Sequence, residues 1–410
     1  MMTVALIASP VRMAWQSLFA LASVGMVSSS VYLLLALAAT LLDRCKGKAE
    51  VHSPQDDALP TVTILKPLHG FEPRLEENLE SFFPQDYPWF EIVFGCRDAA
   101  DPAVEVVERL RRRFPHVRTK LVFSGPPRWP SAKVWSLAKM AEAATGEIFV
   151  ISDSDILAPV DFLRRVVPPI LVTENGTETG LVTCLYHGVP ASSFWSRMEA
   201  LGMSVEFASG VLVAQMLEGM SFALGAAMVL RRTVLEEVGG LSSLADYYSD
   251  DFVLGRHVAQ AGYCVRLSPC RVEHVLCETS FRKTFATQRR WMQSTRYSRP
   301  LGHLGTGLTY AVPYGLLALL AGCVLGHPAV GAGLLLASWL NRAVQSIVVG
   351  YGAIGDSRAL RRALLYPVRD MLGFAAWVAS YSGGREFPWR GERYRFGPKG
   401  KIEAVERASS

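Results

Sequence analysis

Residues 150–157 read VISDSDIL, an apolar run that leads into two carboxylates one residue apart, Asp153 and Asp155. The pattern predicts a buried strand whose end delivers both acids to a reversal of the chain. Two carboxylates at this spacing can approach one Mg²⁺ or Mn²⁺ ion, which would bridge the oxygens of a nucleotide diphosphate. Taken alone the signal is weak, because Asp-x-Asp is also common in solvated turns and helix caps.

The segments before this run alternate between expected strands and expected helices. Strands are expected at 62–68, 90–98, 119–125 and 147–155, and helices at 73–83, 102–114 and 133–144. This alternation predicts βαβ units and a mostly parallel sheet, and therefore a Rossmann-like α/β domain. Ligands of such sheets bind at the carboxyl ends of the strands. Asp98 and Asp153 fall at strand ends, so both are expected at a ligand site.

The amino-terminal region is expected to be a membrane anchor. Mean hydropathy is +0.21, and residues 15–42 are uncharged over more than the ~20 residues that cross a bilayer. A cleaved signal peptide is the alternative, but the run is too long and no clear cleavage site follows it. Arg44, Lys46 and Lys48 follow the run and only Arg12 precedes it. The positive-inside rule therefore places residues 44 onward in the cytoplasm, and the expected location is a bacterial inner membrane.

Further apolar stretches lie near the carboxyl terminus. Residues 304–326 and 329–352 are candidates for spanning helices, although Asn341 and Arg342 weaken the second. A third stretch, 364–382, is expected to be interfacial or re-entrant, because spanning would carry the basic tail outside.

The apolar residues 200–230 contain Glu206, Glu218 and several glycines, so no spanning helix is expected there. A segment facing the membrane or an acceptor is the preferred interpretation. The expected organisation is an anchor at 1–48, a linker at 49–60, a cytoplasmic domain at 61–300, membrane helices at 301–384 and a basic tail at 385–410.

Charge and cysteine usage argue against two classes of function. The net charge of +5 is modest and no aromatic stacking pattern accompanies it, so no nucleic-acid partner is expected. The seven cysteines form no C-x-x-C pair, which fits a reducing compartment. Cys264, Cys270, His274 and Cys277 match no common zinc spacing, and ordinary thiols are expected.

Two later motifs add chemistry. Asp250 and Asp251 open an expected helix, where they are either N-cap residues or, for Asp251, a general base whose pKa its neighbour could raise. Further on, Gln288, Arg290 and Trp291 place guanidinium and indole groups together. Arginine can hold a diphosphate and tryptophan can wall a sugar pocket. The alternative is a basic amphipathic helix lying on lipid headgroups.

In this order along the chain, the motifs resemble those of the ceramide glucosyltransferases, glycosyltransferase family 21, and of the similar bacterial hopanoid-associated glycosyltransferases. The resemblance covers residues 61 to about 395. It is carried by Lys66-Pro67-Leu68-His69-Gly70, Asp86-Tyr87-Pro88, Asp98, Asp153, Asp251, Arg290-Trp291 and the tail segment 389–395. It implies a membrane-anchored GT-A fold, a UDP-sugar donor such as UDP-glucose, and inversion at the anomeric carbon. Asp98, Asp153 and Asp251 match the three family aspartates, the last of them the proposed base.

Three positions depart from this pattern or extend it. Thr287 stands where the family has Gln or Arg, with Gln288 one place later, so the role of Gln288 is in doubt. Asp155 completes an Asp-x-Asp that animal members can lack, which favours a metal here. Lys133 resembles the family's lysine segment, and either touches the diphosphate or is a solvated residue at a helix start.

The sequence therefore predicts a lipid glycosyltransferase. The expected substrate-binding residues are Asp98, Lys133, Asp153, Asp250, Gln288, Arg290 and Trp291, the expected ligands of Mg²⁺ or Mn²⁺ are Asp153 and Asp155, and the base is Asp251. The acceptor is expected to be the primary hydroxyl of ceramide or a similar lipid, with a hopanoid or diacylglycerol as the alternative. A nucleotide-binding transporter or scaffold would not need Asp251, and a processive synthase would need more spanning segments.

Overall fold

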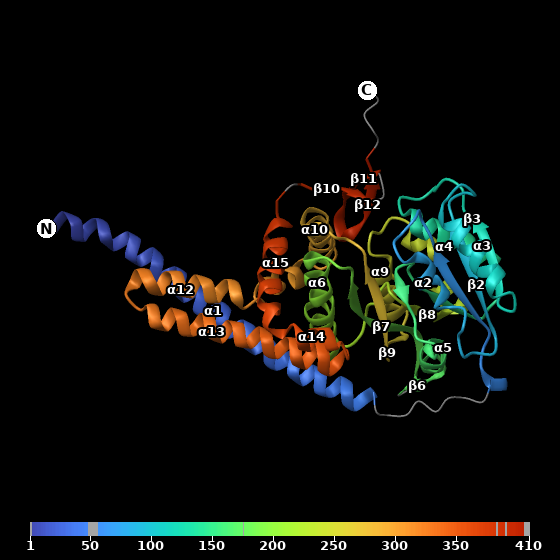
Figure 1. Ribbon diagram of the computed structural model, residues 1–410, viewed down its shortest axis with the longest axis horizontal. Helices are drawn as coiled ribbons and strands as arrows, with labels where there is room; N and C mark the ends of the chain where they lie inside the picture. The colour runs from blue at the N-terminus through green and yellow to red at the C-terminus, as the bar shows by residue number, and fades with distance from the viewer. Residues whose placement is uncertain (1, 48–55, 175, 383, 390–391, 406–410) are drawn as a thin grey trace, which may run out of the picture. The chain divides into compact units, whose positions relative to one another are not determined.

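The computed structural model describes residues 2–47, 56–174, 176–382, 384–389 and 392–405 (Figure 1). The chain forms two compact units, each built from three stretches of sequence. We call them the helical unit (Met1–Arg44, Ser193–Met216 and Thr279–Gly384) and the α/β unit (Cys45–Ser192, Leu217–Glu278 and Arg385–Ser410).

The α/β unit is organised around a nine-stranded sheet of order β3-β2-β1-β4-β8-β7-β9-β5, with β6 paired to β7. Strands β1 to β4 are parallel, which confirms the prediction for the first half of the sheet. The second half is mixed, because β8 runs antiparallel to both β4 and β7 whereas β7 and β9 are parallel. The strands are β1 Val62–Pro67, β2 Phe90–Cys96, β3 Arg118–Phe123, β4 Ile148–Ile151, β5 Ile156–Leu157, β6 Thr173–Glu174, β7 Thr177–Pro190, β8 Met228–Arg231 and β9 Cys264–Leu276.

Apolar side chains cover both faces of this sheet. Neighbouring residues of β1 point to opposite faces, so Ile64 packs in one core with Phe82 while Leu65 packs in the other with Leu137. This two-sided burial is why the central strands read as continuous apolar runs. The helices of the unit are α2 Leu75–Glu80, α3 Ala103–Arg113, α4 Ala132–Ala143, α5 Phe162–Val166, α8 Arg232–Glu237 and α9 Asp250–Gln260, with short helical turns η1 Asp56–Ala58, η2 Pro168–Leu171 and η4 Leu241–Leu244.

The basic tail contributes a second, three-stranded sheet to the α/β unit. Its antiparallel strands are β10 Glu386–Trp389, β11 Glu392–Phe396 and β12 Ile402–Ala404, with η7 Pro398–Gly400 before the last. The rings of Phe387 and Phe396 lie 5.4 and 5.5 Å from that of Tyr248. The tail therefore packs against the segment that leads into α9.

Among the residues that the structure describes, three helical runs, all largely within the helical unit, are long and apolar enough to cross a membrane: Pro10–Cys45, Phe194–Glu218 and Pro328–Ala353. The helices Pro300–Gly307 and Val312–Leu325, bent by 46°, would make a fourth if they act together. The sequence predicts no spanning helix at 200–230, but the run Phe194–Glu218 overlaps this stretch and is a candidate by length and composition. The helices are α1 Met2–Gly47, α6 Phe194–Leu201, α7 Ala208–Glu218, α10 Phe281–Ser298, α11 Pro300–Gly307, α12 Val312–Leu325, α13 Pro328–Gln345, α14 Ser357–Arg361 and α15 Tyr366–Ala379, with π-helical η3 Gly202–Phe207 and η5 Ser346–Ala353 and a 3₁₀ turn η6 Ala363–Leu365.

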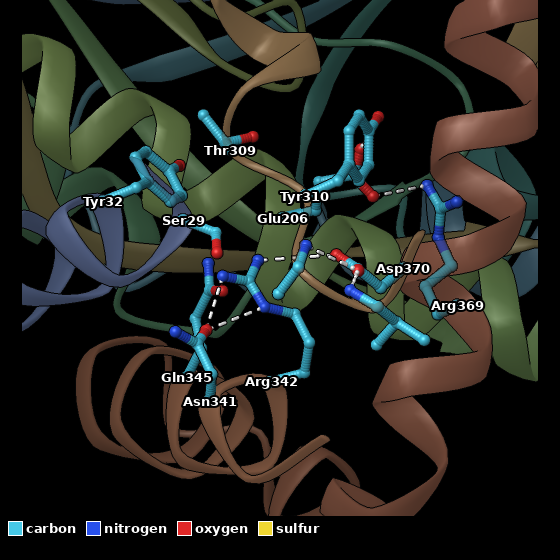
Figure 2. Close-up of polar contacts among 12 residues, drawn as sticks. Ser29, Tyr32, Glu206, Thr309, Tyr310, Asn341, Arg342, Gln345, Arg369 and Asp370 are labelled. Carbon is cyan, nitrogen blue, oxygen red and sulfur yellow. Dashed lines mark hydrogen bonds and ion pairs between the residues drawn. The ribbon is translucent and has the colours of Figure 1, made fainter. Parts of the chain in front are cut away.

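Polar residues that weakened the predicted span at 329–352 are paired inside this unit (Figure 2). The Arg342 guanidinium is 2% exposed and donates to Asn341 Oδ1 at 3.0 and 2.6 Å. It also lies 3.4 Å from Asp370 Oδ1, while Asp370 Oδ2 accepts from the backbone N–H groups of Ala311 and Val312. Asp370 therefore balances the charge of buried Arg342 and also accepts hydrogen bonds from the free N–H groups at the start of α12.

Candidate active site

A pocket of about 570 Å³ lies beyond the carboxyl ends of β1, β2 and β3. Asp98, two residues after β2, lines it together with His69, Arg97, Asp101 and Gly125. The Asp98 carboxylate accepts a hydrogen bond from the Ala100 N–H at 2.9 Å and is exposed on its other side. A cavity of this size accommodates a nucleotide-sized ligand.

Lys133 joins two of the predicted acids. Its Nζ lies 2.8 Å from Asp153 Oδ1 and 3.2 Å from Asp250 Oδ2, and only 13% of its side chain is exposed. Ser131 caps α4 by accepting from the Val134 N–H, which fixes Lys133 in the first turn. The alternative of a solvated helix-start lysine is therefore wrong, and contact with a diphosphate stays a prediction.

Asp251 lies in the first turn of α9 with its Oδ1 accepting from the Phe252 N–H at 2.7 Å. The N-cap position belongs to Ser249, so neither Asp250 nor Asp251 is the N-cap. Burial, and secondarily the charge of Asp250, raises the pKa of Asp251 to about 6, while Lys133 opposes the rise. The charge of Asp250 thus raises the pKa of Asp251 as predicted, although burial of Asp251 away from water raises it more.

Gly225, which no sequence pattern singled out, lies against both Asp153 and Asp251. A methyl group added to it would lie 3.2 Å from Asp251 Oδ2 and 3.3 Å from Asp153 Oδ2. Thr183 fixes this segment, because its buried hydroxyl accepts from the Leu224 N–H and donates to the Ala227 carbonyl. The two carboxylates therefore face one backbone position that carries no side chain.

Asp155 lies between β4 and β5, and its carboxylate has a partner of its own. Its Oδ2 lies 3.0 Å from His274 Nε2. Burial, the largest single effect, would raise the pKa of Asp155, but His274, Lys66 and a backbone N–H together outweigh it and lower the pKa to about 2. The carboxylate is thus held in the ionised form that a cation needs.

Lys66 is a buried cation behind the Asp-x-Asp segment. Its Nζ donates to the Asp153 carbonyl at 2.5 Å and to Ser152 Oγ at 3.3 Å, and lies 3.9 Å from the Phe82 ring centroid. Burial lowers the pKa of Lys66 to about 7, although the nearby carboxylates act in the opposite direction. The sequence placed Lys66 in a family motif without giving it this role.

The carboxylate oxygens at this site could bind a divalent cation together with oxygen atoms of a bound ligand. Among the described residues there is no group of three or more His, Cys, Asp and Glu side chains that could hold a metal by itself. Asp155 Oδ1, however, is buried and accepts no hydrogen bond from any described residue. Asp153 and this free oxygen would supply two hard ligands, and diphosphate oxygens the others.

Gln288, Arg290 and Trp291 lie on α10 in the helical unit. Gln288 is 8% exposed, donates to Glu199 Oε1 at 3.3 Å and accepts from Arg369 Nη2 at 2.9 Å. Arg290 and Trp291 are half-buried. The remaining predicted site residues belong to the α/β unit, which brings Lys133, Asp153, Asp250 and Asp251 together.

The family model described as "Glycosyl transferase family 21" matches residues 21–402. Ceramide glucosyltransferase 3 of Caenorhabditis elegans is 28% identical over 209 residues, which are 51% of this chain and 45% of that protein. A ceramide glucosyltransferase of Komagataella phaffii is 36% identical over 141 residues, 32% of this chain and 28% of that protein. The match therefore spans less than half of the length of either relative.

A solved structure has a similar fold. It is that of the mannosyltransferase PcManGT from Pyrobaculum calidifontis in complex with GDP-Man and Mn²⁺. The similarity covers 88% of this chain and 99% of that one, with a TM-score of 0.51 and 21% sequence identity. At this identity the likeness concerns the fold.

Proposed function

The chain belongs to glycosyl transferase family 21 and has the GT-A fold, and from this premise we propose that it transfers a hexose from a nucleotide sugar to a lipid hydroxyl in a membrane. The observation that carries the proposal is the convergence of the Asp153 and Asp251 carboxylates on Gly225. It places a carboxylate that could hold a cation bound to the donor diphosphate beside a carboxylate that could act as a base for the acceptor.

In the proposed reaction the nucleoside occupies the pocket that Asp98 lines, and its diphosphate lies near Lys133 and Asp153. A divalent cation held by Asp153 and Asp155 would neutralise charge on the departing diphosphate. Lys133 adds a positive charge at the same place, and the paired His274 and buried Lys66 keep the acidic segment in position.

Asp251 is the proposed general base. Its carboxylate takes the proton of the acceptor hydroxyl as that oxygen forms a bond to the anomeric carbon. The bond from this carbon to the diphosphate oxygen breaks, and its electron pair leaves with the nucleoside diphosphate. A single displacement of this kind inverts the anomeric configuration. A pKa raised to about 6 makes Asp251 a stronger base than an ordinary aspartate.

The proposed substrates are UDP-glucose and the primary hydroxyl of ceramide or a similar lipid. The names of the curated relatives support this choice. A hopanoid or diacylglycerol acceptor is the alternative. The three candidate spans support a multi-pass membrane protein, and the basic residues after the first of them support a cytoplasmic catalytic domain at a bacterial inner membrane.

The direct test incubates membranes containing the chain with radiolabelled UDP-glucose and each acceptor in turn. We expect label in the lipid phase with ceramide, and none in membranes that lack the chain. If label appeared only with a hopanoid or diacylglycerol, that lipid would replace ceramide as the assigned acceptor. Absence of label in every lipid, with folded protein present, would refute the proposed function.

Gly225→Ala should lower transfer by about 100-fold, because a methyl group there crowds both carboxylates and moves reacting groups by a fraction of an ångström. The φ angle of Gly225 is not in the left-handed region, so alanine fits the backbone. Gly397→Ala is the matched control, since a methyl group there makes only ordinary contacts at 3.7 Å. Equal activity of the two variants, measured as initial rates with purified protein, would contradict the role of Gly225.

A further inference from the structure

A small pocket lies within the helical unit among α6, α10 and α15, and the reaction proposed above does not use it. Its volume is about 20 Å³, which admits one group of about the size of a water molecule. Its wall is mainly aromatic and its floor is polar, so it differs from an empty packing defect.

Aromatic rings form the wall and the mouth of the pocket. The Trp195 ring lies 4.7 Å from that of Phe281, which lies 5.5 Å from that of Phe285. Phe281 is 45% exposed, as is Phe194 beside Trp195. Trp195 belongs to the run Phe194–Glu218, a candidate membrane span. Exposed rings at the end of such a helix are typical of the lipid headgroup region.

The floor offers side chains that can donate and side chains that can accept hydrogen bonds. Glu199 and Arg369 carry opposite charges, and Gln288 bridges them. Thr284 Oγ1 and Arg369 Nε are buried and have no hydrogen-bond partner among the described residues. Buried polar atoms without partners are costly unless a ligand or water completes them. A neutral hydroxyl would do so, whereas a phosphate would meet the Glu199 carboxylate.

Buried pairs hold this floor in place (Figure 2). Arg369 Nη2 lies 2.9 Å from Glu206 Oε2, and Tyr310 donates to Glu206 Oε1 at 3.1 Å. The next residue, Asp370, is paired with Arg342. The charge of Arg369 is thus already balanced inside the unit, so the pocket that it lines does not call for an anion.

We propose that this pocket binds a hydroxyl group of a neutral lipid acceptor, while the exposed rings of Phe194 and Phe281 cover the adjoining apolar part of the lipid. This inference rests on the proposed function, since it names a subsite for the lipid substrate.

The test uses the full chain in nanodiscs with a photoreactive ceramide, followed by peptide mass spectrometry and by initial rates at varied ceramide. We expect crosslinks within residues 194–199 or 281–288. Thr284→Val keeps the shape and removes the hydroxyl, so the apparent KM for ceramide should rise about threefold to tenfold. Thr295→Val, at an exposed position of the same helix, is the control and should leave it unchanged. Trp195→Ala should reduce crosslinking.

The possible outcomes separate this inference from the proposed function. Equal crosslinking by wild type, Thr284→Val and Trp195→Ala would overturn the proposal that the pocket binds the lipid. Water would then be its occupant. Equal labelling by a photoreactive phospholipid would overturn the preference for a neutral group. Ceramide crosslinks in this pocket without any transfer of sugar would support the pocket and refute the proposed reaction. UDP binding, measured in parallel, should be the same in all variants.

Discussion

Replacing Asp251 by Asn should reduce sugar transfer by about 10²- to 10⁴-fold, the usual contribution of a positioned general base. The amide keeps the size of the side chain and can still accept from the Phe252 N–H. It cannot take a proton from an acceptor hydroxyl. UDP binding should persist, because Asp98 and Lys133 are unchanged. The measurement is the initial rate of lipid glycosylation beside calorimetric titration with UDP.

The control for this variant is Asp246→Asn. The Asp246 carboxylate is half exposed and pairs with Lys401 at 3.3 Å, and it has no ion pair with Lys133. It should retain wild-type activity. If Asp251→Asn turned over at a near-normal rate, the assignment of the base would be wrong. If it lost UDP binding as well, Asp251 would have a structural or donor-binding role instead.

The same carboxylate gives the reaction a definite pH dependence. Only ionised Asp251 can accept a proton, and its pKa is raised to about 6. Transfer should therefore fall about tenfold for each pH unit below 6 and level off above it. The wild-type profile of kcat/KM should show this limb, and the residual activity of Asp251→Asn should lack it.

The sequence predicted the half of the sheet formed by β1 to β4, whose strands are joined by short helical segments along the chain. Strands β1, β2 and β4 are buried on both faces, whereas β3 at the edge of the sheet is partly exposed, so apolar runs locate the first three of these and the turns locate β3. Strands β7 and β9 pair across a long intervening stretch of sequence, with register shifts at Thr179/Leu181 and at Cys184/Leu185. Their partnership depends on contacts that no local pattern encodes.

The candidate site divides in a similar way. Acids at strand and helix ends could be predicted, because carboxylates stand out against apolar surroundings. Lys66 and His274, which adjust them together with Lys133, could not, since Lys66 lies inside an expected strand and His274 was considered only beside its neighbouring cysteines. Gly225 was missed for a different reason. Its importance lies in the absence of a side chain beside Asp153 and Asp251, which is visible only once the chain is folded.

The largest loss of stability is expected from Arg342→Met. The variant leaves the Asp370 carboxylate buried at 2% exposure without its cation, and breaking a buried ion pair from one side costs about 3–5 kcal/mol. Asp370 would still accept from the backbone N–H groups of Ala311 and Val312, so the helical unit should fold but unfold at a lower denaturant concentration.

A second substitution tests the cause. Asn in place of Asp370 keeps a carbonyl oxygen for the two N–H groups and removes the unpaired charge, so Arg342→Met/Asp370→Asn should recover most of the lost stability. Arg395→Met is the control, because its pair with Glu386 is about half exposed and such pairs contribute roughly 0–1 kcal/mol. Unfolding of the detergent-solubilised protein should rank wild type above the double variant and the double variant above Arg342→Met. If the single variant were as stable as Arg395→Met, the buried pair would not hold the helices together. If the double variant were the least stable, packing of the arginine stem would matter more than its charge.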